Sequence, residues 1–109
     1  MAKATPYPLD VQVALQRLGE NVRVARVRRR MSQEVLAQAC GISRKTLYSL
    51  ESGAPGATTA TVFTVLWKLG LLGTTQALAD PDTDEHGKIL EAAQRPTRVR
   101  HSVALDHDF

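Results

Sequence analysis

The chain has 109 residues, of which 43% are hydrophobic and 23% are charged. This length and composition are typical of one small globular domain. No apolar run approaches the roughly 18 residues that a membrane span needs, and no apolar segment of a secretory signal follows Met1. The single cysteine, Cys40, excludes an internal disulfide framework and a multi-cysteine metal site. We therefore expect a cytoplasmic protein that does not contact a membrane.

The formal net charge of +3 is unevenly divided along the chain. Residues 1–79 contain ten Lys or Arg and four Asp or Glu, whereas residues 80–109 contain four and seven. A basic body with a more acidic tail suggests a polyanion partner for the body and a different partner for the tail. From charge alone, the alternative is an ordinary solvated surface.

A flexible N-terminal arm is predicted for residues 1–8, which contain two prolines and little apolar material. The first helix is predicted from Leu9 to about Arg30, because apolar residues recur there at spacings of three and four. Gly19 lies inside this segment and predicts a bend or a late start of the helix. Arginines gather in its second half, where cations suit the helix dipole.

Two short helices are predicted next in the chain. Ser32 is a suitable N-cap for a helix over residues 33–40, and Gly41 fits the left-handed position just past its end. Ser43 is a suitable N-cap for the following helix, over residues 44–51. Two capped helices joined by a short turn that contains glycine are the helix-turn-helix pattern.

A fourth helix is predicted over residues 60–69, with Thr58 or Thr59 as its cap, and it is apolar on nearly all sides. The stripe predicted to join the core consists of Val62, Leu66 and Leu69. The second stripe consists of Phe63, Trp67 and Leu71. A small domain has no neighbours for both stripes, so the second is interpreted as a homodimer interface, with ordinary core as the alternative.

A fifth short helix is predicted from Thr74 or Thr75 to Ala79, so that the helix-turn-helix domain spans residues 9–79. Residues 80–109 are interpreted as a tail for dimer or partner contact. In this tail an acidic start predicts a short helix that carries Ile89, Leu90 and Ala93. Residues 98–104 are predicted either to form a strand that pairs with its two-fold mate or to be disordered.

The start of the second helix in the helix-turn-helix pattern would meet base edges in the major groove of DNA. Arg44 and Lys45 can donate to O6 and N7 of guanine, and Ser49 lies one turn after Lys45 on the same face. Gln33 begins the preceding helix and can donate to a phosphate. The alternative is a pair of solvated charges, but their place at a capped helix start favours DNA contact.

The stretch MSQEVLAQACGISRKTLYSLESG, residues 31–53, resembles the XRE (Cro/cI-type) family of helix-turn-helix repressors. The resemblance begins at residues 18–23 and continues to residues 65–71, VLWKLGL, and so covers more than half of the chain. The resemblance implies an all-α, five-helix, lambda-repressor-like domain with a C-terminal tail. Such a domain acts as a homodimer on a pseudo-palindromic operator in double-stranded DNA, which would associate the protein with the nucleoid. The resemblance also implies base reading by Arg44, Lys45 and Ser49, and a structural ion pair between Arg26 and Glu51. Contacts to the DNA backbone are assigned to Gln33, Ser43, Thr46, Tyr48, Arg28 and Thr58.

Two departures from the family pattern affect this prediction. Val35 stands where relatives often have an acid, and residues 54–57 have no Lys or Arg where relatives often hold the DNA backbone. Phosphate contact in that loop must then come from main-chain N–H groups or from Thr58 and Thr59. Affinity would depend more on the arginines of the first helix and on the N-terminal arm.

Residues 51–81 are similar to the HipB-type antitoxin branch of this family, which has a threonine-rich cap and an aromatic fourth helix before an extended C-terminal segment. This resemblance implies a repressor that controls its own operon and holds a HipA-like serine/threonine kinase toxin. Contacts to such a partner are assigned to Arg98, Arg100 and Phe109. The alternatives are a free-standing regulator of phage or restriction-system type and, in another class, a protein-interaction scaffold.

Neither an enzyme nor a cofactor is expected, because no paired carboxylates, glycine-rich phosphate loop or Ser/His/Asp set stands on a rigid element. His101 and His107, together with Asp106 and Asp108, could form a metal site, but such a site is not expected at a chain end without helical spacing. Cys40 is interpreted as a structural thiol that faces the core.

Overall fold

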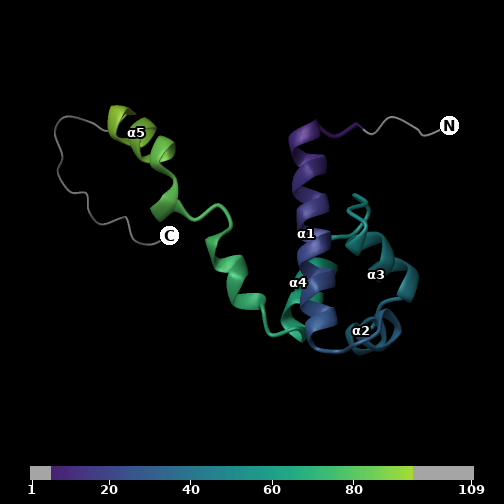
Figure 1. Cartoon of the computed structure of the whole chain (residues 1–109). Helices are drawn as coiled ribbons and strands as arrows, with labels where there is room; N and C mark the ends of the chain where they lie inside the picture. Colours follow the sequence, from purple (N-terminus) through teal and green to yellow (C-terminus); the bar gives the residue numbers. More distant parts are fainter. Residues whose placement is uncertain (1–5, 95–109) are drawn as a thin grey trace. The chain divides into compact units, whose positions relative to one another are not determined.

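The computed structural model describes residues 6–94, and these residues contain helices and no strand. The helices in chain order are α1 (Leu9–Arg28), α2 (Gln33–Cys40), α3 (Arg44–Glu51), α4 (Thr59–Lys68), the 3-10 helices η1 (Leu72–Ala77) and η2 (Pro81–Thr83), and α5 (Glu85–Gln94) (Figure 1). The predicted all-α fold class is confirmed. The chain divides into two compact units, Met1–Gln76 and Ala77–Phe109, which are described separately.

Helix α1 is continuous from Leu9 to Arg28, so the predicted late start at Gly19 is wrong. Gly19 is buried because α3 ends against it. A Cβ atom at this position would lie 2.5 Å from the carbonyl oxygens of Leu50 and Glu51. The glycine therefore allows the backbones of α1 and α3 to approach closely.

Helices α2 and α3 are capped as their sequences predict. The Ser32 hydroxyl accepts a hydrogen bond from the backbone N–H of Val35 over 3.1 Å. The Ser43 hydroxyl accepts one from the N–H of Thr46 over 3.0 Å. Between the two helices Gly41 has φ 73°, the left-handed conformation that ends α2.

The core of the first unit lies between α1, α2, α3 and α4. Its largest fully buried side chains are Leu36, Leu47, Val22 and Val65. Helix α4 contributes Val65 and Leu66, and its C-cap residue Leu69 is also buried, while Val62 is only partly buried at the edge. Of the predicted core stripe, Leu66 and Leu69 are thus buried and Val62 packs at the edge, while Val65, which was not predicted to join the core, is fully buried. Thr58, not Thr59, caps the helix.

The predicted fifth helix is a 3-10 helix that begins earlier, at Leu72. The threonines at its start do not act as N-caps. Instead, the Thr74 hydroxyl donates to the carbonyl of Leu71 over 2.7 Å, and the Thr75 hydroxyl donates to the carbonyl of Leu72 over 2.6 Å. These hydroxyls satisfy carbonyl groups behind them because a tight 3-10 turn brings those groups within reach.

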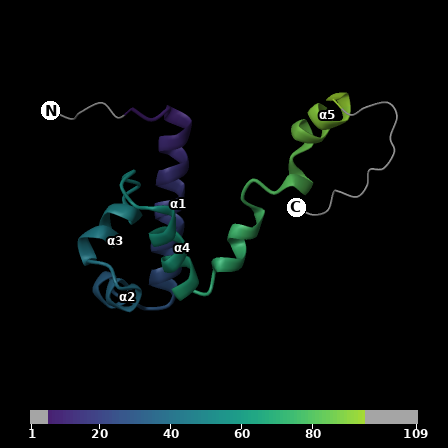
Figure 2. The same ribbon diagram turned by 180° about the vertical axis from the view of Figure 1, so that it is seen from behind.

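The second unit contains η2 and α5, of which α5 is labelled in Figure 2. Its turns are held by aspartate side chains. Asp80 accepts a hydrogen bond from the N–H of Asp82 over 2.9 Å, and Asp84 accepts one from the N–H of Gly87 over the same distance. Neither η2 nor α5 has a buried residue. None of the helices within residues 6–94 has the length and apolar character to cross a membrane.

Candidate nucleic-acid interface

Helix α3 has one buried and one exposed face. Leu47, Leu50 and Glu51 point into the domain. Arg44, Lys45 and Tyr48 are exposed on the other side, and Tyr48 is 57% exposed to solvent. Because these three residues start the helix or lie one turn later, they form one continuous polar surface at its N-terminal half. Of the residues assigned to base reading, Ser49 lies at the edge of this surface and is half-buried.

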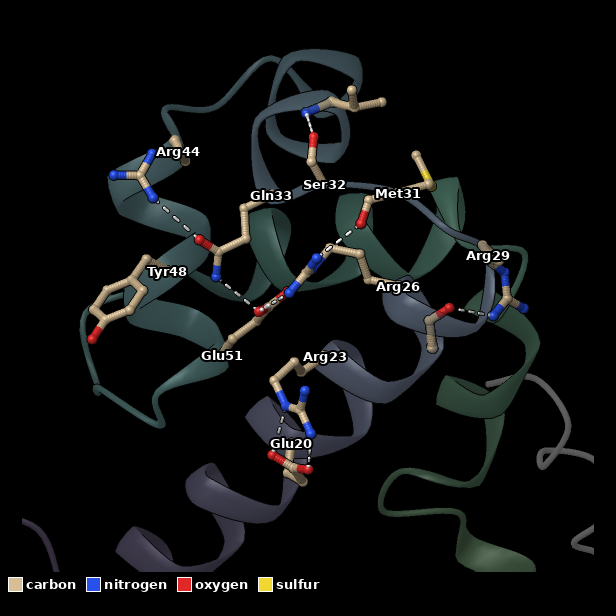
Figure 3. A network of polar contacts seen from close by, with 12 residues as sticks. Glu20, Arg23, Arg26, Arg29, Met31, Ser32, Gln33, Arg44, Tyr48 and Glu51 are labelled. Carbon is tan, nitrogen blue, oxygen red and sulfur yellow. Dashed lines mark hydrogen bonds and ion pairs between the residues drawn. The ribbon is translucent and has the colours of Figure 1, made fainter.

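A polar network behind this surface joins α1, α2 and α3 (Figure 3). Arg26 Nε donates to Glu51 Oε2 over 2.7 Å, and Arg26 Nη2 donates to Glu51 Oε1 over 3.0 Å. The two side chains are 11% and 3% exposed, so water screens this ion pair little. Arg26 Nη1 also donates to the carbonyl of Met31 over 2.8 Å, which holds the link between α1 and α2. A two-pronged contact of this kind fixes the end of α3 against α1.

Gln33 connects this network to the exposed surface of α3. Its Nε2 donates to Glu51 Oε1 over 3.0 Å, and its Oε1 accepts a bond of 3.3 Å from Arg44 Nη1. Gln33 was predicted to contact a DNA phosphate, whereas the contacts of the same amide with Arg44 and Glu51 were not predicted. A signal for the Arg44 contact was present in the sequence, since both residues begin helices of the same motif. Its geometry follows only from the packing of α2 on α3.

The C-terminal end of α1 presents further arginines. Arg28 is exposed and has no hydrogen bond or ion pair within the described part of the chain. Arg29 caps the helix end by donating to the carbonyl of Ala25 over 2.8 Å, a role the sequence analysis did not assign. Arg30 adopts a left-handed φ of 55° and turns the chain toward α2. Of these three, only Arg29 has its guanidinium group engaged within residues 6–94, so those of Arg28 and Arg30 are available to contact an anion such as a phosphate.

The remaining residues assigned to the DNA backbone lie at helix starts. Ser43 and Thr46 bond to each other through their hydroxyls at 2.9 Å, in addition to the cap. The Thr58 hydroxyl accepts from the N–H of Thr61 and donates to the Thr61 hydroxyl over 3.0 Å. These hydroxyls are thus engaged in capping. The adjacent helix starts still present the positive ends of helix dipoles, which favour phosphate groups.

The residues assigned to a dimer interface differ in exposure. Trp67 is 58% exposed, whereas Phe63 and Leu71 are half-buried and Leu71 packs against the core. Lys68 Nζ lies 5.5 Å from the centre of the Trp67 ring, within the range of a cation–π contact. The tail residues Arg98, Arg100 and Phe109, and the predicted strand over residues 98–104, lie outside the described residues.

Cys40 contacts the edge of the core and is half-buried. Burial raises the pKa of its thiol, and the nearby Lys68 charge opposes this effect. A thiol that stays protonated is a poor nucleophile. Among residues 6–94, His, Cys, Asp and Glu side chains form no group of three that could hold a metal ion.

A comparison with known families places these features in context. A family model described as a helix-turn-helix domain matches residues 17–81, which is more than half of the chain. A search of curated proteins finds no match. The match covers the capped helices α2 and α3, the network at Glu51 and all of α4. The chain therefore belongs to the helix-turn-helix domain family, in the XRE (Cro/cI-type) class, which indicates a DNA-binding regulator.

Proposed function

We propose that the protein is a sequence-specific transcriptional repressor that binds double-stranded DNA as a homodimer. In this proposal α3 enters the major groove, Arg44 and Lys45 read guanine edges, and Ser49 contacts a neighbouring base. The starts of α2, α3 and α4, together with Arg28, hold phosphates on either side. Two-fold symmetry would place half-sites about 34–36 Å apart or a multiple of that distance. Domains of this family are typically not enzymes, which agrees with the expected absence of catalysis.

The observation that carries this proposal is the support behind Arg44. Its guanidinium bonds to Gln33, Gln33 bonds to Glu51, and Glu51 is held by Arg26. Each link is a side chain with a fixed partner, so Arg44 is partly ordered before DNA arrives. Ordering a long side chain in advance lowers the entropy that is lost on binding, and so favours specific contacts.

The test begins by selecting an operator from random DNA with the wild-type protein and measuring affinity by fluorescence anisotropy. We expect Arg44→Ala to weaken operator binding by about 1–3 kcal/mol and to relax preference at one base position. Arg28→Ala serves as the matched control, because loss of a phosphate contact weakens all sequences about equally and lowers the salt dependence. If Arg44→Ala preserved the base preference, α3 would not read bases through this residue. A protein-interaction scaffold would instead show no salt-sensitive DNA binding at all.

Dimerisation is proposed through the second stripe of α4, where Phe63, Trp67 and Leu71 lie. The exposure of Trp67 supports this role, since a large aromatic ring in water is typical of an interface core. Trp67→Ala should shift the protein from dimer to monomer in sedimentation equilibrium and weaken operator binding. A dimer that persists in this variant would exclude α4 as the main interface.

The narrower proposal is an antitoxin that pairs with a HipA-like kinase toxin. It is supported by the sequence similarity of residues 51–81 and by the character of the second unit. Residues 77–94 contain five acidic side chains and one Lys, a charge that DNA repels, so this unit suits a partner other than DNA. The alternative is a free-standing regulator without a toxin.

The two are separated by expressing the chain together with the product of the adjacent gene. An antitoxin should co-purify with a kinase-like neighbour and lose that partner when residues 95–109, with Arg98, Arg100 and Phe109, are removed. If the adjacent gene does not encode a kinase-like protein, the antitoxin proposal fails and the free-standing regulator is favoured. Unchanged toxin binding after truncation would exclude the assigned role of the tail.

A further inference from the structure

One side of α1 carries a shallow groove that does not belong to the nucleic-acid interface. It is lined by Asp10, Val13, Ala14, Arg17, Leu18 and Asn21. Leu18 is partly buried against the core, but the other side chains are exposed, and Val13 is 48% exposed to solvent. In Figures 1 and 2 the first turns of α1 extend beyond α2, α3 and α4, so no other helix of the first unit covers them.

This side of α1 lies opposite α3. Gly19, where the end of α3 contacts α1, follows Asp10 by nine residues. At about 3.6 residues per turn, nine residues make two and a half turns, so the two positions point in opposite directions. A molecule bound in the groove would therefore leave the exposed surface of α3 free.

The side chains in the first part of the groove form a symmetric pattern. Val13 and Ala14 occupy the centre of this part, with Asp10 three residues before Val13 and Arg17 three residues after Ala14, while Leu18 and Asn21 extend the groove beyond it. If a second α1 lies antiparallel across this centre, a two-fold axis passes between Val13 and Ala14. The axis brings Asp10 of each copy beside Arg17 of the other, so one interface contains two identical ion pairs.

Charge decides which molecule fits the groove. Neither Asp10 nor Arg17 has a hydrogen bond or ion pair with any residue in the described range 6–94, and the two lie seven positions apart, too far for a pair within one helix. An anion such as DNA would meet the Asp10 carboxylate, whereas a second copy of α1 complements both charges. Ala14 at the centre is small enough to let two helix backbones approach.

We propose that the exposed side of α1 is a second self-association surface, through which two copies of the chain pair with their α1 helices antiparallel. The interface centres on Val13 and Ala14 and is flanked by ion pairs between Asp10 and Arg17. It shares no residue with the stripe on α4, so the two surfaces can be occupied together and can join repressor dimers side by side. The pairing does not rest on DNA binding and would occur in its absence.

Cysteine cross-linking of the full chain tests the register. In a Cys40→Ala background, Ala14→Cys places a thiol beside the two-fold axis, within the Cβ separation of about 3.5–4.5 Å that a disulfide needs. The control is Glu20→Cys, on the same helix, whose two copies would lie about 20 Å apart along the pair. We expect the Ala14→Cys variant to form disulfide dimers at least tenfold faster in a mild oxidant. Equal rates for the two variants would overturn the proposal.

Charge reversal then tests the ion pairs, with each variant also carrying Cys40→Ala and Ala14→Cys. Asp10→Arg alone and Arg17→Asp alone each place like charges opposite one another, so both should cross-link several-fold more slowly. An equimolar mixture of the two should recover the original rate, because each copy then meets its opposite charge. The mixture controls for folding, since a variant damaged on its own would not be rescued by another chain. Unchanged rates in the single variants, or no recovery in the mixture, would overturn the proposal.

Discussion

Within residues 9–69, nine apolar residues are buried in one core, whereas within residues 77–94 no residue is buried at all. Both regions are helical, but different interactions hold them. The body is held by side chains that are distant in sequence, such as Val22, Leu47 and Val65, which are buried in one core. In the second unit the helix depends on local contacts: the Asp84 cap and a 3.6 Å ion pair between Lys88 and Glu85.

This difference predicts how the stability of each region responds to amino-acid substitution. A helix of about ten residues without tertiary packing is only marginally stable in water. The body should therefore unfold as one cooperative unit, while α5 should melt by itself without affecting it. The following substitutions, matched between the two regions, test this comparison from the largest expected effect to the smallest.

The largest effect is expected from a leucine pair. Leu47 is fully buried and Leu90 is 47% exposed. Leu47→Ala should lower the free energy of unfolding by about 4 kcal/mol, because it removes packed atoms and leaves a cavity. Leu90→Ala should leave the urea midpoint of the body unchanged. A large shift for Leu90→Ala would mean that α5 packs on the body in solution.

The second comparison removes one carboxylate from each region. Glu51→Ala leaves Arg26 largely buried without its partner and frees Gln33, so the free energy of unfolding should fall by about 3 kcal/mol. Glu85→Ala removes a solvent-exposed ion pair and should have no measurable effect on that quantity. Both are measured by urea denaturation at neutral pH. If the two variants were equally stable, the network behind α3 would contribute nothing to the body.

The third comparison uses two helix glycines. Gly19→Ala forces a Cβ atom against the backbone of Leu50 and Glu51, which cannot move alone, so about 2 kcal/mol of stability should be lost. Gly87→Ala also meets a close neighbour, but that neighbour is the movable side chain of Asp84. This variant should lose the cap of α5 and a small part of the helical circular dichroism signal, with no change in the melting of the body. A stable Gly19→Ala variant would show that α1 and α3 are not held in close contact.

The smallest effect concerns thiol reactivity. The pKa of Cys40 is raised, mainly by burial, so less of it is thiolate at any given pH near 8. Alkylation of Cys40 should be slower than that of a thiol introduced on α5 by Ala92→Cys in a Cys40→Ala background. The rates should converge as pH rises well above the pKa of both thiols, or when urea unfolds the body. Equal rates at pH 8 in the folded protein would show that Cys40 is accessible.

Much of the helix-turn-helix motif could be predicted from local sequence. Ser32 and Ser43 cap helices because a short hydroxyl side chain reaches the N–H groups of the first turn, and Gly41 ends α2 because it tolerates a positive φ. These rules act within a few residues and need no knowledge of the rest of the fold. The same local reasoning placed Arg44 and Lys45 at an exposed helix start.

Three features were decided only by tertiary structure. Gly19 is needed because the carbonyl groups at the end of α3 lie against it. Val65 is buried because of the orientation in which α4 packs on its neighbours. Neither feature follows from periodicity alone. The link from Arg44 through Gln33 to Glu51 likewise needs three helices to meet. The sequence by itself determined where α2 and α3 begin and end, because their capping and backbone conformation are local. Which faces meet, and which charges remain free for a partner, depended on packing between residues that are distant along the chain.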